Sequence, residues 1–175
     1  MKKSHEAHRS KGKRVLSFFL TTVSSSRFAK MRDGSAYTDE SGDLADQIIR
    51  DKDHKVLKRS LIADDPKMIR STVKGFFRSG ADVLVFTGGT GVSPSDVTVE
   101  TVVPFFEKEL VGFGELLRSL SFKRIGSAAM LTRSTAGTAR GKLILCLPGS
   151  PDGVETALLN FISEFPHVVA VAGGS

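Results

Sequence analysis

The segment ADVLVFTGGTGVSPSD, residues 81–96, joins an apolar run to a glycine-rich loop. The run 82–86 is nearly all hydrophobic, which is typical of a strand covered on both faces in a mainly parallel sheet. Ligands of open α/β sheets bind just past the ends of such strands. Glycines there permit positive φ angles, so that successive backbone N–H groups can point at one anion. The segment therefore predicts a phosphate-binding loop with six candidate contacts: Thr87, Gly88, Gly89, Thr90, Gly91 and Ser93.

Two better-known phosphate loops do not match this segment. A Walker A loop needs Gly-Lys-Ser/Thr, and no lysine lies between Thr87 and Lys108. A dinucleotide fingerprint that began at Gly89 would need a glycine where Pro94 stands. The glycines could also serve only a tight turn from strand to helix, so the loop taken alone leaves both roles open.

The rest of the chain alternates strand and helix patterns, which indicates an α/β layered fold. Strands are predicted at 14–23, 55–63, 82–86 and 142–148, with a weaker fifth at 127–132. Apolar residues at helical spacing predict helices at 41–53, 66–78, 114–122 and 152–165. The segment 24–40 has no regular pattern, and a loop of that length is usually functional or mobile.

The length of 175 residues and the ordinary composition fit one domain, residues 14–175, with a short tail before it. The net charge is +6, and residues 1–14 account for +5 of it, so the body is nearly neutral. We expect residues 1–13 to be a basic, flexible tail. Weak nucleic-acid contact through this tail is the alternative, but we do not expect a nucleic-acid partner, because the body is nearly neutral.

Targeting and redox features favour the cytoplasm. The apolar stretch 15–20 is too short for a secretory signal, and no stretch approaches the ~18 apolar residues of a membrane span. Cys146 is the only cysteine, so neither a disulfide framework nor a thiolate zinc site can form.

Four motifs, in this order, resemble the MoaB/Mog family of molybdenum cofactor biosynthesis proteins. They are TGGTGVSPSDVTVE (87–100), VGFGELLRSLSF (111–122), LTRSTAG (131–137) and LPGSPDGVETAL (147–158). The resemblance runs from about residue 15 to about residue 165. It implies the molybdopterin-binding fold, a three-layer α/β/α sandwich with a mainly parallel central sheet, commonly assembled as a homotrimer or a higher multiple.

The resemblance also implies an activity. Active members of the family use Mg²⁺ and ATP to transfer AMP to the phosphate of molybdopterin, releasing pyrophosphate before a metal-insertion protein acts. Other members of the same fold only bind or carry the cofactor. The sequence therefore predicts a molybdopterin adenylyltransferase, with a non-catalytic binding protein as the alternative.

Two aspartates are the predicted catalytic residues and magnesium ligands. Asp65 precedes Pro66, so it is expected to cap a helix, whereas its neighbour Asp64 has no such local duty. Asp64 and Asp96 both match acids of active family members. Thr98 is expected to cap the helix that follows Asp96. AMP transfer to an ionised phosphate needs little general base and much charge neutralisation, which carboxylate-bound Mg²⁺ provides.

The remaining predicted contacts to nucleotide or pterin come from three segments. They are Glu115, Ser134, Thr135, Gly137, Pro148, Gly149 and Ser150. Each has a structural alternative: Glu115 on a helix surface, 133–137 in a polar hairpin, and Ser150 as a helix cap ahead of Pro151. Ser95 stands where many family members carry arginine, so Arg133 or Arg140 is expected to supply the missing positive charge.

Overall fold

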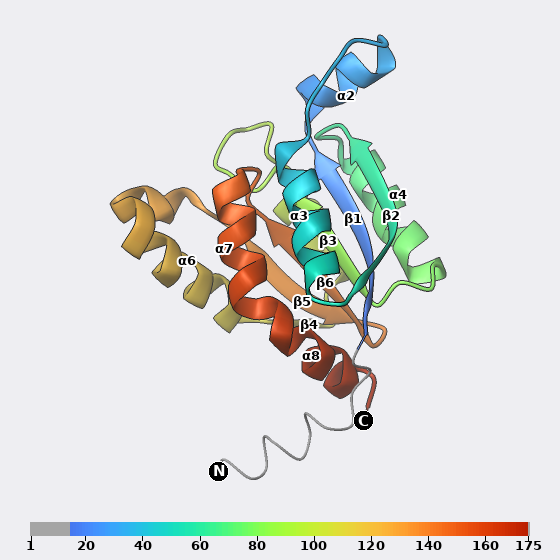
Figure 1. The fold of residues 1–175 in the computed structure, drawn as a ribbon, viewed down its shortest axis with the longest axis vertical. Helices are drawn as coiled ribbons and strands as arrows, with labels where there is room; N and C mark the ends of the chain where they lie inside the picture. Colours follow the sequence, from blue (N-terminus) through green and yellow to red (C-terminus); the bar gives the residue numbers. More distant parts are fainter. Residues whose placement is uncertain (1–14, 175) are drawn as a thin grey trace.

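The computed structural model describes residues 15–174, and the predicted basic tail lies outside them. Within these residues one six-stranded sheet has the order β2-β1-β3-β6-β5-β4 (Figure 1). β1 pairs in parallel with β2 and with β3, and β3 pairs in parallel with β6, whereas β5 is antiparallel to β6 and to β4. The strands are β1 (Ser17–Val23), β2 (Lys55–Ile62), β3 (Val83–Thr87), β4 (Lys108–Glu109), β5 (Thr135–Ala139) and β6 (Lys142–Leu147). The prediction of a mainly parallel central sheet is confirmed.

Helices cover both faces of the sheet. Figure 1 shows α3, α7 and α8 on one face and α4 on the other. The helices are α2 (Ser25–Arg32), α3 (Glu40–Asp51), α4 (Pro66–Arg78), α5 (Thr98–Val102), α6 (Val111–Ile125), α7 (Pro151–Phe161) and α8 (Phe165–Ala172). Short 3-10 helices follow three of them: η1 (Val103–Phe105), η2 (Gly126–Leu131) and η3 (Ile162–Glu164). The molecule is a three-layer α/β/α sandwich, as predicted.

Two separate hydrophobic clusters form the core, one on each face of the sheet. Successive residues of a strand point to opposite faces, so Phe18 packs with α3 and α8 while Phe19 joins the cluster under α4. In the central strand Val85 and Phe86 divide in the same way, and all of β3 is buried. A fully buried side chain of this size contributes about 2 kcal/mol. The continuous apolar runs in the sequence thus reflect strands that are buried on both faces.

The predicted fifth strand at 127–132 is wrong, because this segment forms the 3-10 helix η2. The strand lies a few residues later, where β5 (TAGTA) includes most of segment 133–137, for which a polar hairpin was the structural alternative. Its small residues have low strand propensity but leave room for close packing. A Cβ atom at Gly137 would lie 2.3 Å from the ring of Phe106. Packing against this ring, which no local pattern reveals, explains the glycine at position 137.

Helix caps were largely predictable from the sequence. Asp65 accepts a hydrogen bond from the Lys67 N–H (2.9 Å) ahead of α4, and Ser150 accepts one from the Gly153 N–H (3.2 Å) ahead of α7. The prediction for Thr98 is wrong, because Thr98 is the first residue of α5 and the capping position, Val97, offers no side-chain bond. The long segment expected to be irregular contains helix α2, which has no buried residue and projects from the body (Figure 1).

The carboxyl ends of the four parallel strands lie on the same side of the sheet, here called the carboxyl edge. This side carries the candidate site. Val23, Ile62, Thr87 and Leu147 are the last residues of β1, β2, β3 and β6. The loops that follow them carry Ser25, Asp64, the glycines and the PGSP segment. No helix among the described residues is long and apolar enough to cross a membrane.

Candidate active site

The glycine loop packs so closely against its neighbours that two of its positions need glycine. Gly88 has φ +105°, and a Cβ atom there would lie 2.3 Å from the carbonyl oxygen of Val23. Gly89 has φ +64°, and its Cβ would lie 2.3 Å from Thr98 Oγ1. The Gly88 N–H donates to the Leu147 carbonyl (3.1 Å), which ties the loop to the end of β6. The loop is therefore a fixed part of this sheet edge.

Asp64 lies against this loop, as expected for a residue of the site. Its Oδ1 is 3.0 Å from where a Cβ of Gly89 would be. Its Oδ2 accepts two hydrogen bonds from Ser25, from the backbone N–H (2.8 Å) and from the hydroxyl (2.9 Å). The Ser25 hydroxyl also accepts from the Asp64 N–H (3.0 Å). Ser25 therefore sets the orientation of the carboxylate, a role that sequence reasoning missed although three serines follow the end of β1.

Asp96 lies against the other end of the loop. Its Oδ2 is 2.8 Å from where a Cβ of Gly91 would be, and it accepts from the Ser93 N–H (3.0 Å). The Asp96 N–H donates in return to the Ser93 carbonyl (2.9 Å). Both predicted carboxylates thus border one glycine loop, and each keeps an Oδ1 atom with no hydrogen-bond partner among the described residues.

The hydroxyl groups of the loop are partly engaged inside the protein. Thr90 Oγ1 donates to the Leu147 carbonyl (3.3 Å), and Thr87 Oγ1 lies 3.4 Å from Thr22 Oγ1. Ser93 Oγ lies 2.8 Å from Ser95 Oγ at the exposed tip. Buried Thr87 and Thr90 therefore support the loop in this structure, and the backbone N–H groups remain its main candidate anion donors.

Arg133 reaches the loop from the junction of η2 and β5. Its Nε donates to the Gly91 carbonyl (2.7 Å) and its Nη2 to the Asp96 carbonyl (3.3 Å). It also forms an ion pair with Glu100, and this hydrogen bonding lowers the pKa of Glu100 and raises that of Arg133. Of the two arginines predicted to supply charge to the phosphate, Arg133 lies at the loop. Arg140 lies in the turn between β5 and β6, at the amino-terminal end of β6 and so on the side of the sheet opposite the carboxyl edge. Its guanidinium lies over the Phe77 ring.

A hollow of about 350 Å³ opens next to the loop, between α6 and β5. Ser134 and Thr135 line it as expected for contact residues, and the buried Ser134 Oγ has no hydrogen-bond partner among the described residues. Arg133 separates this hollow from a second one of about 350 Å³ that Asp96 lines.

The other predicted contact residues lie at varied distances from the loop. Gly149 approaches Gly88 closely, since its Cβ would lie 3.2 Å from the Gly88 Cα. Pro148 and Ser150 flank it between β6 and α7. Glu115 is exposed on α6 and lines none of the hollows described here, and Gly137 lies under Phe106. Gly137 therefore has a packing role, and the Glu115 side chain forms no hydrogen bond or ion pair with the residues that the structure describes.

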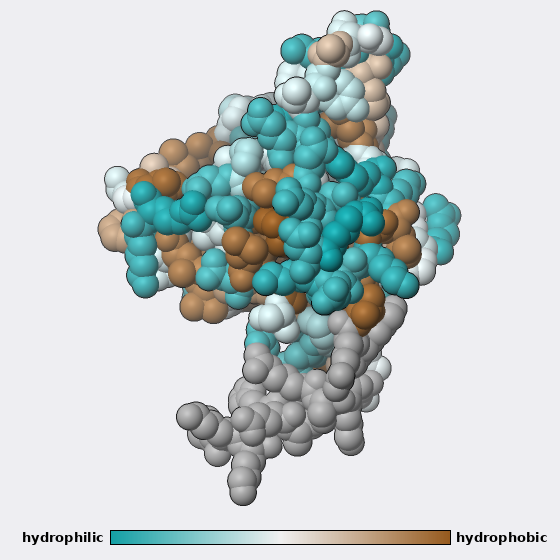
Figure 2. Space-filling model, viewed as in Figure 1, coloured by the Kyte–Doolittle hydropathy of each residue, from teal (hydrophilic) through white to brown (hydrophobic). Residues whose placement is uncertain are grey.

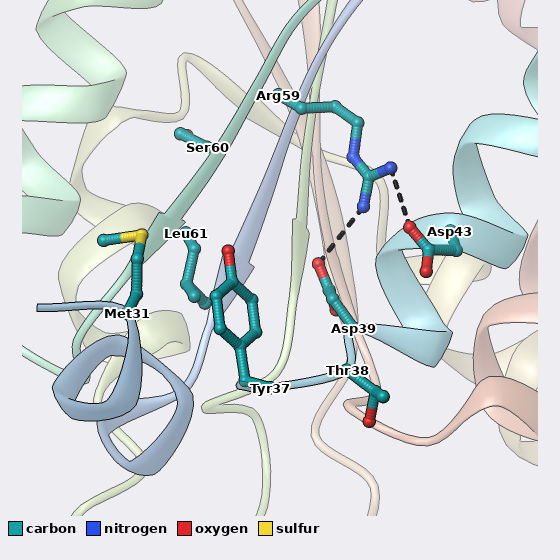
Figure 3. Close-up of a pocket in the computed structure, with 8 residues that line it drawn as sticks. All are labelled: Met31, Tyr37, Thr38, Asp39, Asp43, Arg59, Ser60 and Leu61. Carbon is teal, nitrogen blue, oxygen red and sulfur yellow. Dashed lines mark hydrogen bonds and ion pairs between the residues drawn. The ribbon is translucent and has the colours of Figure 1, made fainter. Parts of the chain in front are cut away.

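A further hollow, of about 590 Å³, lies to the side of the loop between α2 and strand β2 (Figure 3). Arg59 bridges Asp39 (3.3 Å) and Asp43 (2.8 Å) on one wall, and Tyr37 and Met31 stand opposite (Figure 3). Asp39 in turn accepts from Thr22 Oγ1 (2.7 Å), the hydroxyl next to Thr87. Arg59, the arginine that lines this hollow, is already paired with two aspartates. We therefore place the phosphate site at the glycine loop and not in this hollow.

Comparisons with known proteins agree with this geometry. Residues 20–167 match the family described as "Probable molybdopterin binding domain". The chain belongs to this family. It is 37% identical to the "Probable molybdopterin adenylyltransferase" of Methanocaldococcus jannaschii, over 88% of this chain and 92% of that protein. It is 39% identical to "Molybdenum cofactor biosynthesis protein B" of Bacillus cereus, over 75% of this chain and 79% of that protein.

Solved structures extend the likeness to the whole fold. The tungsten cofactor synthesizing protein MoaB from Pyrococcus furiosus superimposes with a TM-score of 0.82 at 34% identity. The superposition covers 92% of this chain and 99% of that one. The membership predicted from the four motifs is confirmed, together with a role in molybdenum or tungsten cofactor biosynthesis.

Proposed function

We propose that this member of the family is a molybdopterin adenylyltransferase, which transfers AMP from Mg²⁺-ATP to the phosphate of molybdopterin and releases pyrophosphate. One observation carries the proposal: Asp64 and Asp96 border the same glycine loop at the carboxyl edge of the sheet. A relative that bears this activity in its name, the protein of Methanocaldococcus jannaschii, matches 88% of the chain.

A magnesium ion fits the donor set of this site. Mg²⁺ is usually held by one or two carboxylates, with substrate phosphates and water completing six oxygen ligands. Asp64 Oδ1 and Asp96 Oδ1 have no other partner among the described residues, whose side chains form no cluster of three or more acidic, histidine or cysteine ligands. When bound, the ion would neutralise the charge of the two anionic reactants.

The protein's own groups would orient the phosphates for in-line attack. The backbone N–H groups of the loop can hold phosphate oxygens, and the first turn of α7, after Pro151, adds further N–H donors. The attacking phosphate oxygen is already ionised near neutral pH, so no side chain has to remove a proton. Positioning and charge neutralisation then supply most of the catalysis.

The hollow beside β5 supports a place for the pterin ring. It is lined by Glu109 and Arg118, a proton acceptor and a donor, and by Val111 and Met130 as apolar walls. A pterin edge offers N–H donors next to a carbonyl oxygen, which such a pair complements. The unpartnered Ser134 hydroxyl adds a further polar contact.

The decisive test is a direct assay of the product. The protein is incubated with molybdopterin, ATP and Mg²⁺, and adenylylated pterin is sought by mass spectrometry. We expect AMP transfer by the wild type and a loss of at least roughly 100-fold in Asp64→Asn and Asp96→Asn, because each removes a charge that holds the metal. Asp51→Asn, an exposed acid at the far end of α3, is the matched control and should keep full activity.

The alternative, a non-catalytic carrier of the cofactor, gives a different result in the same assay. It predicts that wild type and both variants bind molybdopterin equally well and that none forms the adenylylated product. That outcome, with a known active family member positive in parallel, would refute the enzymatic proposal.

We also propose that the chain acts as a homotrimer, or a higher multiple, in the cytoplasm. Support comes from α6 and η2, where large apolar side chains are exposed, and Figure 2 shows hydrophobic residues along the side that carries α6. The exposed residues are Leu116, Phe122, Ile125, Met130 and Leu131. An apolar surface of this kind usually meets a partner. The adenylylated product would pass to a separate metal-insertion protein, and the lone buried Cys146 suits a reducing compartment.

A further inference from the structure

The loop that carries Asp96 has no regular structure of its own. Between the end of β3 and the start of α5 the chain forms only bends and turns, and residues 92–95 are exposed. Segments of this kind are mobile unless other groups hold them. Because Asp96 Oδ2 is oriented by the Ser93 N–H, the carboxylate is only as well positioned as the loop itself.

Arg133 fastens this loop at several points. Its guanidinium donates to the carbonyl oxygens of Gly91 (2.7 Å) and Asp96 (3.3 Å). Its own backbone N–H donates to the Thr90 carbonyl (3.3 Å). The side chain spans the loop from Gly91 to Asp96, the metal-ligand candidate, and the backbone adds a contact at Thr90, so one residue closes both ends of the segment.

The peptide geometry gives these contacts a second effect. In a trans peptide the C=O of one residue and the N–H of the next point in opposite directions. By drawing the Gly91 and Asp96 carbonyls to itself, Arg133 turns the N–H groups of Val92 and Val97 to the opposite side. An arginine can do this at two carbonyls at once because its donors form a rigid fork, which a lysine lacks.

Glu100 occupies most of the remaining capacity of the guanidinium. It pairs with Nη1 and also accepts from Nη2 (3.4 Å). With Nε directed to Gly91, nearly all the donors of Arg133 are in use inside the protein. A guanidinium so engaged, with its charge balanced by a carboxylate, is poorly placed to receive a phosphate.

We propose that Arg133 is a positioning residue, which holds the Asp96 loop in shape while Glu100 holds Arg133, rather than a cation that binds substrate phosphate. The proposal rests on the proposed function for its effect on AMP transfer, but its structural part does not. It assigns a role to a side chain that lies between the two hollows next to the loop.

Three variants separate positioning from phosphate binding. Arg133→Gln and Arg133→Lys should each raise the Mg²⁺ concentration for half-maximal AMP transfer by roughly tenfold. A tenfold change corresponds to the loss of one hydrogen bond to a charged group. Glu100→Gln leaves the carbonyl contacts in place and should change it by less than about threefold. A phosphate-binding role predicts the reverse order: Arg133→Lys nearly as active as wild type, and Glu100→Gln with a lower KM for ATP. That order would overturn the proposal.

Hydrogen exchange tests the same idea without any substrate. In Arg133→Gln the amides of Ser93 and Asp96, which are hydrogen-bonded within the loop, should exchange roughly tenfold faster, while those of β3 stay protected as in the wild type. Arg140→Gln is the matched control, because it removes an arginine at the opposite edge of the sheet. Unchanged exchange in Arg133→Gln would refute the positioning role. If exchange speeds up in a protein without AMP transfer, the proposed function fails and the positioning role stands.

Discussion

Asp64 and Asp96 border one glycine loop, yet different parts of the molecule hold them. Asp64 is oriented by Ser25, 39 residues away in the sequence, at the start of a helix that projects from the body (Figure 1). Asp96 is oriented by Ser93, three residues away, inside a loop that Arg133 fastens. One carboxylate thus depends on a distant and exposed element, and the other on a local turn. We expect substitutions that disturb one carboxylate to leave the other in place. Only changes in the glycine loop, which both carboxylates border, should affect the two together.

The largest effect should come from the shared loop, in Gly89→Ala. A methyl group there would lie 2.3 Å from Thr98 Oγ1 and 3.0 Å from Asp64 Oδ1, on a residue with φ +64°. Strain and the displaced Asp64 should lower the free energy of unfolding by about 1–3 kcal/mol and abolish AMP transfer. Urea denaturation measures the first effect and the product assay the second.

The same substitution at Gly75 is the matched control. Gly75 lies inside α4, and apart from its own helical backbone and its two chain neighbours no atom lies within 4 Å of where its Cβ would be. Gly75→Ala should therefore raise the free energy of unfolding by up to about 1 kcal/mol. Equal behaviour of the two variants would show that the loop is not packed as described.

The contrast between the two carboxylates also marks what the sequence could reveal. Asp96, its loop and the cap at Asp65 depend on neighbours in the sequence, and motif and turn chemistry predicted them. The support of Asp64 by Ser25 joins the ends of β1 and β2, and it appears only once the parallel pairing of these strands is known. Local patterns carry no signal for such contacts.

The absence of a local signal also explains why the strand predicted at 127–132, on the antiparallel side of the sheet, is wrong. The apolar segment 127–132 has the composition of a strand, but it lies in η2, and β5 follows it in small residues, of which Gly137 fits beneath Phe106. The central strands were predictable since burial on both faces leaves a continuous hydrophobic run. An edge shaped by the fit of particular side chains leaves no such run.

A smaller effect is expected from Ser25→Ala, which loosens Asp64 alone. It removes the hydroxyl that donates to Asp64 Oδ2 (2.9 Å) and keeps the backbone bond (2.8 Å). The Mg²⁺ concentration for half-maximal activity should rise by several-fold, and the free energy of unfolding should fall by less than about 1 kcal/mol. Ser26→Ala, next to it in the same helix, should change neither.

Combining Ser25→Ala with Arg133→Gln tests whether the two supports are independent. Changes at separate sites with no shared partner usually add to within about 0.5 kcal/mol. We therefore expect the two shifts in Mg²⁺ dependence to multiply. A double variant no worse than Arg133→Gln alone would mean that one carboxylate already loses its place when the other is disturbed.

The smallest effect is expected beneath the loop, in Thr98→Val. Thr98 Oγ1 is buried and has no hydrogen-bond partner among the described residues, whereas buried Thr90 donates to the Leu147 carbonyl (3.3 Å). Valine keeps the shape of threonine and removes a hydroxyl whose burial is not compensated, so Thr98→Val should leave the free energy of unfolding unchanged or raise it by up to about 1 kcal/mol. Thr90→Val, which loses a real bond, should lower it by about 1 kcal/mol. A loss of stability in Thr98→Val as large as that in Thr90→Val would mean that the hydroxyl has a partner at Gly89, and that the loop rests on a hydrogen bond there as well as on close packing.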